Sequence, residues 1–309
     1  MTTPAHTFSV PPDGESYVSN IIDRCYDLID TAVWQGIDKA RLNAWLANFS
    51  DSMEERYFAC VVLDALIYRS HDQTLSLLVQ LFQRVLPDLH RKAWPGVTGI
   101  NDWIVALQNP NVDCGTRLVP VIRDDDPPTK SGPLVARLLK RHLRLREDWM
   151  IWPWQVSDAL KQGVSMFVFI DDFLGTGWQF RGFLDRMRLN EHLKQARFLY
   201  APLVAHTKGL AALSKEAPEI KCSAVEILEE HHGLFSKDGY FFRDGVNSPK
   251  SAREFYLQLL HRHGLTRLGK KAFGYGRLGV ACAFEHAAPN ASLPLLWLDA
   301  NGWTPLFDR

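Results

Sequence analysis

The strongest chemical signal in the sequence is a pair of adjacent aspartates, Asp171 and Asp172, between an apolar run and a glycine-rich loop. Residues 167–180 read FVFIDDFLGTGWQF. Carboxylates accept hydrogen bonds from vicinal hydroxyl groups, and they also hold the water shell of Mg²⁺. The two acids therefore predict a binding site for a ligand that carries neighbouring hydroxyl groups.

The loop that follows the acids is suited to a phosphate group. Gly175 and Gly177 allow a ligand to approach the backbone closely, and Thr176 adds a hydroxyl donor. A loop of this kind before a helix N-terminus points several backbone N–H groups at one anion. Sugar hydroxyls on one side and a phosphate on the other describe a ribose 5-phosphate.

The pattern around the acids predicts the elements that position them. Residues 165–170 read SMFVFI, a continuous apolar strand of the kind that is buried on both faces of a parallel sheet. Ligands of open α/β sheets bind at the carboxyl edge, where this strand delivers the two acids. Helical segments separate it from three further predicted strands, at 117–123, 196–206 and 220–228.

The stretch FVFIDDFLGTG resembles the fingerprint of the phosphoribosyltransferases. The resemblance implies that Asp171 and Asp172 bind the ribose hydroxyls of phosphoribosyl pyrophosphate (PRPP). It also implies that Mg²⁺ lies near both acids and is held through substrate or water. The implied 5-phosphate cradle consists of Gly175, Thr176, Gly177, Trp178 and Gln179. Family members usually end this loop with small residues and a Thr or Ser, so Trp178 and Gln179 depart from the pattern.

An earlier segment supports the same resemblance. The predicted strand 117–123 is followed by the loop DDDPPTKSG and by a helix predicted at 133–146. Phosphoribosyltransferases place a pyrophosphate-binding loop in this position. The resemblance therefore assigns pyrophosphate binding to Lys130, Ser131 and Gly132, where a helix start and a cation favour an anion. It covers roughly residues 113–230.

The residues before this region have a helical period throughout. Val18, Ile21 and Cys25 make one apolar face, and Ser50-Asp51-Ser52 offers caps for the helix that follows. The expected fold is a type I phosphoribosyltransferase-like parallel sheet, with helices on both faces, behind an all-helical N-terminal module. The expected parts are a flexible tail at 1–15, the helical module at 16–112, the α/β core at 113–245, and a C-terminal helix, strand and tail at 246–309 packed on the core.

Other polar groups carry weaker signals. Glu285 and His286 follow the last predicted strand and are candidates for a base pocket, and Trp152 and Trp154 suit either base stacking or packing. The run at 124–126 is an acidic loop whose three consecutive side chains do not converge easily on a metal. The histidines at 231, 232, 261 and 263 lack metal-type i,i+4 spacing and are expected on the surface or in packing.

Composition narrows the class of protein. Acidic and basic residues balance at 35 each, which counts against a dedicated nucleic-acid binder. The five cysteines are scattered, so neither a disulfide framework nor a zinc motif is indicated. The N-terminus lacks the features of a signal peptide, and no apolar stretch approaches the roughly 20 residues of a membrane span. A cytoplasmic protein with no membrane contact is expected.

The whole layout is similar to phosphoribosyltransferase-like effectors of bacterial anti-phage conflict systems, some of which accompany retron reverse transcriptases. The resemblance implies an antiviral enzyme that acts with Mg²⁺ on PRPP or a ribonucleotide. It also implies defence-system partners such as a reverse transcriptase with its nucleic acid. The alternative is a catalytically inactive nucleotide sensor or protein-interaction module, which Trp178 and Gln179 favour. A nucleic-acid-binding regulator is a third reading.

Overall fold

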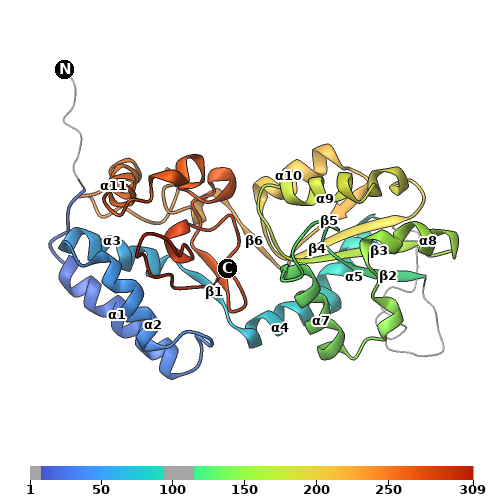
Figure 1. Ribbon diagram of the computed structural model, residues 1–309, viewed down its shortest axis with the longest axis horizontal. Helices are drawn as coiled ribbons and strands as arrows, with labels where there is room; N and C mark the ends of the chain where they lie inside the picture. The colour runs from blue at the N-terminus through green and yellow to red at the C-terminus, as the bar shows by residue number, and fades with distance from the viewer. Residues whose placement is uncertain (1–7, 94–114, 309) are drawn as a thin grey trace, which may run out of the picture. The chain divides into compact units, whose positions relative to one another are not determined.

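A computed structural model of the 309-residue chain describes residues 8–93 and 115–308, which form two compact units (Figure 1). The terminal unit combines Met1–His71 with Glu229–Arg309, and the central unit spans Asp72–Leu228. This division differs from the expected domains, because the C-terminal segment shares a compact unit with the N-terminal helices. The predicted boundary at 112/113 lies outside the described residues.

A parallel sheet forms the middle of the central unit, in the order β2-β3-β4-β5, with β6 also paired to β4. The strand predicted at 165–170 continues through both aspartates to Leu174, because β4 pairs with it along that length. The segment predicted as one strand at 220–228 is two short strands. The bounds are β2 (Thr116–Pro120), β3 (Met166–Leu174), β4 (Arg197–His206), β5 (Ile220–Cys222) and β6 (Glu226–Leu228).

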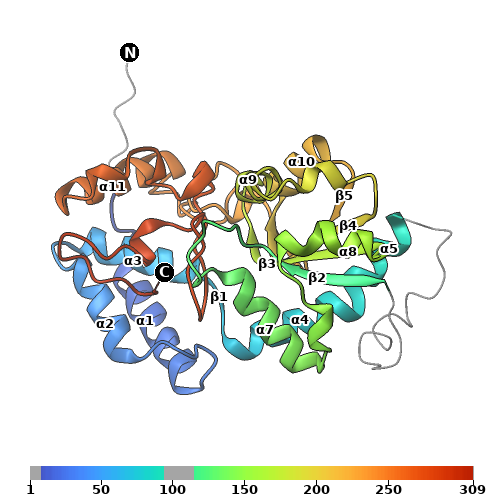
Figure 2. The same ribbon diagram turned by 45° about the vertical axis from the view of Figure 1, so that its right-hand side comes forward.

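Helices cover both faces of this sheet. Figures 1 and 2 show α9 and α10 over one face and α7 on the other. Phe167 and Phe169 of β3 belong to the buried cluster that also contains residues of α8, α9 and α10. The connecting helices are α7 (Ser131–Leu143), α8 (Val156–Lys161), α9 (Trp178–Arg186) and α10 (Thr207–Glu216).

The chain reverses its direction across the sheet between β2 and β3. Leu118 of β2 pairs with Val168 of β3 and also forms a parallel bridge to Met150, which therefore lies on the other edge of β2. After β2 the chain runs through α7 to the edge of β2 that faces away from β3. It then passes back through α8 to β3, and from β3 it continues on the far side to β4. Such a reversal is a topological switch point, the place where doubly wound sheets bind ligands.

The helical region before the sheet is shared between the two units. The helices α4 (His71–Gln80) and α5 (Leu86–Ala93) are joined by a π-helical turn at Leu81–Val85 and belong to the central unit apart from His71. Near α5, the Arg197 guanidinium lies 3.1 Å from His90 Nε2. Among the helices of residues 8–93 and 115–308, none has the length and apolar character needed to cross a membrane.

The terminal unit is mainly helical, as expected for its N-terminal part. Ser52 caps α3, and its hydroxyl accepts the Glu55 backbone N–H. One difference is β1, a three-residue strand too short to leave a period in the sequence, which pairs in parallel with β7. The elements are α1 (Gly14–Asp30), α2 (Lys39–Leu46), α3 (Met53–Asp64), β1 (Ile67–Arg69), α11 (Pro249–Arg262) and β7 (Cys282–Phe284).

Aromatic residues from both ends of the chain form the core of the terminal unit. Phe58 of α3 is fully buried against Phe255 and Tyr256 of α11. Phe8 stacks on Phe255 with ring centroids 4.4 Å apart. The predicted flexible tail at 1–15 is therefore wrong for its described part, because burial of Phe8 anchors the chain well before α1.

Candidate functional site

The two aspartates lie in β3 just beyond the end of β2. Ile170 pairs with Pro120, the last residue of β2, so Asp171 and Asp172 lie beyond the end of β2 and pair with no residue of that strand. Both are nonetheless buried, with 2% and 7% of their surface exposed. Successive strand residues point to opposite faces, but both carboxyl groups lie near the start of α7, where Ser131 Oγ is within 3.4 Å of each.

Hydroxyl groups from two other elements reach these acids. Ser131 at the start of α7 donates to Asp172 Oδ1 at 3.0 Å, and its Oγ lies 3.4 Å from Asp171 Oδ1. The Tyr200 hydroxyl of β4 lies 3.4 Å from Asp171 Oδ2. The Asp172 backbone N–H donates to Asp171 Oδ1 at 3.0 Å. The acids thus already bind hydroxyl groups, which is the chemistry proposed for a sugar ligand.

Burial sets the protonation of this pair. Desolvation, with the neighbouring Asp172 charge as the next cause, raises the pKa of Asp171 well above its ordinary value, while Lys130 acts in the opposite direction. Burial beside Asp171 likewise raises the pKa of the Tyr200 hydroxyl. The raised pKa favours the neutral form of Asp171 more than in an exposed aspartate.

A glycine brings the start of α7 to the acids. A Cβ on Gly132 would lie 2.6 Å from the Val121 carbonyl oxygen and 2.9 Å from its nitrogen, so only glycine permits this approach. The contact holds α7 against the end of β2 and thereby places Ser131 at Asp172. Lys130 precedes the helix as its N-cap and is half-buried.

Helix α10 packs against the loop that follows β3. A Cβ on Gly209 would lie 2.5 Å from the Gly175 carbonyl oxygen, so the helix packs directly on the loop backbone. Gly177, the N-cap of α9, has a φ of +83°. Trp178 is 64% exposed, with the Arg181 guanidinium 4.9 Å from its ring centroid. The bulky side chain that departs from the family pattern therefore does not fill the loop.

The structure brings some of the predicted site residues together and places others elsewhere. Ser131 contacts the acids directly, and the loop at 175–179 follows the end of β3, at the same edge of the sheet. Tyr200 was not predicted, and its only signal was a hydroxyl in an otherwise apolar strand. Glu285 and His286 belong to the terminal unit, where the Glu285 carboxylate accepts the His71 N–H at 2.6 Å.

The remaining candidates pack or form ion pairs. Trp152 and Trp154 stack on each other with centroids 5.2 Å apart, and both rings are about half exposed. In the acidic loop, Asp124 accepts from Arg186 at 2.7 Å and Asp126 pairs with Arg123 at 2.9 Å. Those contacts fit the interpretation of 124–126 as an acidic loop.

The oxygen atoms at the acid pair are of the type that Mg²⁺ prefers, because carboxylate and hydroxyl oxygens are hard ligands. No curated protein matches the chain. The model of the family PRTase-CE, however, matches residues 42–309, which takes in the central unit and most of the terminal unit. The chain therefore belongs to the phosphoribosyltransferase-like PRTase-CE family.

Proposed function

We propose that the chain is an enzyme that binds PRPP or a ribonucleotide with Mg²⁺ and breaks or exchanges the bond at C1 of the ribose. The observation that carries the proposal is the buried acid pair at the switch point, with hydroxyl groups of Ser131 and Tyr200 against it. A ribose would replace the Ser131 hydroxyl at the carboxyl groups.

Each group of residues at the carboxyl edge of the parallel sheet has a role in this proposal. Asp171 and Asp172 bind the vicinal hydroxyls and orient the sugar. The backbone of Gly175, Thr176 and Gly177, continued by Trp178 and Gln179, holds the 5-phosphate at the start of α9. The pyrophosphate lies at the start of α7, on Lys130, Ser131 and Gly132. The helix dipoles of α7 and α9 favour both anions.

Catalysis at such a site depends on position and charge rather than on a covalent nucleophile. The acids stabilise positive charge as it develops at C1, and the edge of the sheet fixes the sugar between its two anions. Mg²⁺, bound through substrate or water, would supply charge that neutralises the diphosphate. Either base transfer or glycosidic cleavage of a nucleotide is compatible with these roles.

Titration calorimetry with PRPP, with and without Mg²⁺, tests the proposal. We expect Mg²⁺-dependent binding by the wild type and no binding by the Asp171→Asn/Asp172→Asn double variant. The matched control is Asp124→Asn/Asp125→Asn, which removes two charges from an exposed loop before α7. The control should bind PRPP within a few-fold of the wild type.

Two results would contradict the enzyme proposal. Full activity of the folded Asp171/Asp172 double variant would remove the acids from the mechanism. Tight nucleotide binding without turnover of any candidate substrate would instead support the alternative, a nucleotide sensor. The exposed Trp178 and Gln179, which replace the usual small residues of the loop, favour that alternative.

We further propose that the activity serves bacterial anti-phage defence, with partners such as a reverse transcriptase and its nucleic acid. The resemblance of the sequence layout to effectors of such systems supports this role. Phage plating on bacteria that carry the wild-type system or the Asp171→Asn/Asp172→Asn system tests it. Equal plating efficiencies on both would speak against a defence function of this site.

A further inference from the structure

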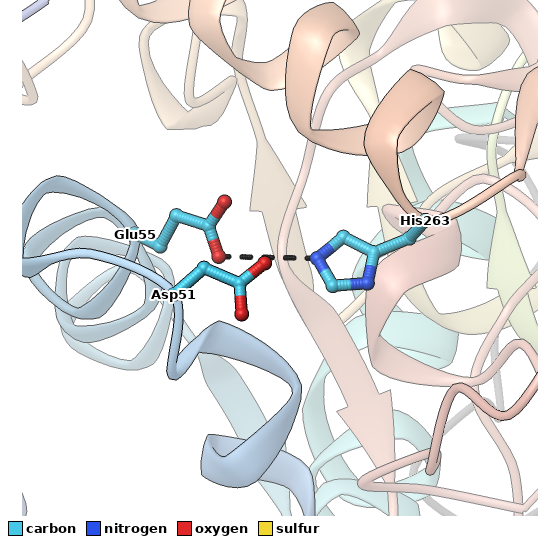
Figure 3. A group of neighbouring side chains, drawn as sticks. All are labelled: Asp51, Glu55 and His263. Carbon is cyan, nitrogen blue, oxygen red and sulfur yellow. Dashed lines mark ion pairs between the residues drawn. The ribbon is translucent and has the colours of Figure 1, made fainter.

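A second cluster of polar side chains lies in the terminal unit. Figure 3 shows Asp51, Glu55 and His263 pointing toward one another. Asp51 precedes α3, Glu55 is in the first turn of α3, and His263 caps the C-terminus of α11. One ligand-type atom from each residue lies within 4.8 Å of the other two. Two carboxylates and an imidazole are thus gathered from segments far apart in the chain.

Glu55 is the unusual member of this cluster. Its side chain is only 1% exposed, and among the described residues its Oε2 atom has no hydrogen-bond partner. The Nε2 atom of His263 is also buried without a hydrogen bond among them. Figure 3 marks these two atoms as an ion pair, but buried polar atoms normally also form hydrogen bonds, so two that face each other without one point to a ligand between them.

The distances suit a metal ion better than a direct contact. His263 Nε2 lies 3.8 Å from Glu55 Oε2, which is too long for a hydrogen bond. Zinc bonds to nitrogen and carboxylate oxygen are about 2.0–2.2 Å, so two ligand atoms of a tetrahedral site lie about 3.3–3.6 Å apart, and a shift of a few tenths of an ångström brings Glu55 and His263 to that separation. The exposed Asp51 can rotate inward to complete the set.

Arg262 holds the other oxygen of the same carboxylate. Its Nη2 lies 2.5 Å from Glu55 Oε1. Carboxylates that bind metals are commonly fixed by such an outer hydrogen bond, which leaves the second oxygen for the ion. Glu55 occupies the helix position whose side chain often turns back to the N-cap, but here it turns to α11 instead.

We propose that Asp51, Glu55 and His263 bind a divalent transition-metal ion of the zinc type, with a water molecule as the fourth ligand. The imidazole favours zinc over Mg²⁺ or Ca²⁺, which prefer oxygen ligands alone. The ion joins the start of α3 to the end of α11 and so links the N-terminal and C-terminal segments of the terminal unit. This site is separate in sequence and in residues from the Mg²⁺-dependent site proposed above.

The test uses the full chain, freed of tags and stripped with a chelator. Zinc titration by calorimetry, with metal analysis after dialysis, should give one bound equivalent and a raised Tm, because only the folded chain binds the ion. Asp51→Asn and His263→Gln should each weaken zinc binding by roughly tenfold or more. Co²⁺ should give visible d–d bands with the wild type that change in His263→Gln.

Three variants serve as controls. Glu54→Gln and His261→Gln change the same residue types beside the cluster and should bind zinc as the wild type does. Asp171→Asn/Asp172→Asn should also retain zinc, whatever happens to nucleotide binding. The proposal is overturned if the wild type retains no stoichiometric zinc, or if Asp51→Asn binds it unchanged. Asp51 is exposed, so that variant keeps the test decisive even if His263→Gln misfolds.

Discussion

Asp171 and Asp172 connect the two helix layers of the central unit at one point of the sheet. Asp171 reaches Tyr200, whose ring stacks on Phe180 of α9 at 3.7 Å between centroids. Ser131, at the start of α7 on the other face, donates to Asp172, and its Oγ also lies 3.4 Å from Asp171 Oδ1. A ligand bound to both acids therefore contacts residues held by helices of opposite layers, which restricts its orientation.

The raised pKa of Asp171 predicts a pH-dependent stability. In the folded chain this carboxyl keeps its proton to higher pH than in the unfolded chain, where its pKa is about 3.9. The stabilisation is fully present below that value and is lost as the pH rises toward the folded pKa, by about 1.4 kcal/mol for each pKa unit. Asp171→Asn should therefore gain stability relative to the wild type as the pH rises.

Urea unfolding of both proteins from about pH 4 to about pH 8 checks this expectation. Asp158→Asn provides a control of opposite sign, since Lys161 lowers the pKa of the exposed Asp158. That variant should lose a little stability at neutral pH. A difference between the wild type and Asp171→Asn that does not change with pH would show that Asp171 is ionised throughout.

The sequence predicts residues of this site only where those residues lie close to one another in the chain. The acids and the loop at 175–179 follow one strand, so their spacing is visible in the sequence. The resemblance implies a pyrophosphate role for Ser131 but not its contact with Asp172, and Tyr200 was missed because its partner is set by strand register. The cluster of Asp51, Glu55 and His263 was missed because packing of α11 against α3, which the sequence does not show, brings His263 to the two acids.

At the scale of elements, glycines set how closely helices approach the site. Gly209 lets α10 contact the backbone of Gly175, and Gly132 lets α7 contact the backbone of Val121. Both contacts are with backbone atoms, which cannot rotate away as a side chain would. The positions of the phosphate loop and of Ser131 thus depend on the absence of one methyl group each.

Gly209→Ala should displace the loop after β3 and destabilise the chain by about 2 kcal/mol or more, because its Cβ would overlap the Gly175 carbonyl. Gly182→Ala is the matched control, since that helical glycine has no atom within 4 Å of the added Cβ. It should stabilise the chain by about 0.5–1 kcal/mol. Thermal unfolding measures both effects.

The same pair of variants also tests the phosphate loop. We expect Gly209→Ala to weaken PRPP binding and Gly182→Ala to leave it unchanged. If both variants bind PRPP equally well, the loop at 175–179 does not hold the 5-phosphate, whatever their stabilities.

The long strands could be predicted from the sequence, whereas the exact bounds of the short strands could not. Residues 196–206 and 165–170 have enough apolar character to identify β4 and β3. The extension of β3 through two aspartates contradicts any local preference and depends on pairing with β4. The three-residue strand β1 was not predicted, whereas β5 and β6 were predicted as one strand at 220–228 because three residues are too few to show where one ends and the other begins.

At the scale of the whole molecule, the two units have separate buried clusters. One contains Phe58, Phe255 and Trp45, and the other contains Phe169, Phe180 and Tyr200. The sequence indicated both sets as apolar, but aromatic residues do not specify which distant segment they pack against. The C-terminal segment at 246–309, expected on the sheet core, shares a compact unit with the N-terminal helices instead.

Phe58→Ala should destabilise the terminal unit by about 3–5 kcal/mol, because this fully buried ring contacts aromatic residues from both ends of the chain. Phe169→Ala is the counterpart in the central unit, where the ring is equally buried. Hydrogen exchange should accelerate in α3 and α11 for the first variant, and in β3 and β4 for the second.

Binding of PRPP separates the two variants further. We expect it to persist in Phe58→Ala and to be lost in Phe169→Ala. Accelerated exchange across the whole chain in both variants would instead mean that the two units unfold as one cooperative body.

The terminal unit contains segments from both ends of the chain, and this affects how it can fold during synthesis. The segment up to His71 leaves the ribosome first, yet the residues that bury its aromatic side chains begin at Glu229. The central unit, made from one continuous segment, can fold as soon as it emerges. During that interval Phe58 and Trp45 remain without their C-terminal partners. The nascent chain therefore exposes these aromatic side chains after the central unit can fold, until translation has produced α11 and the segment that follows it.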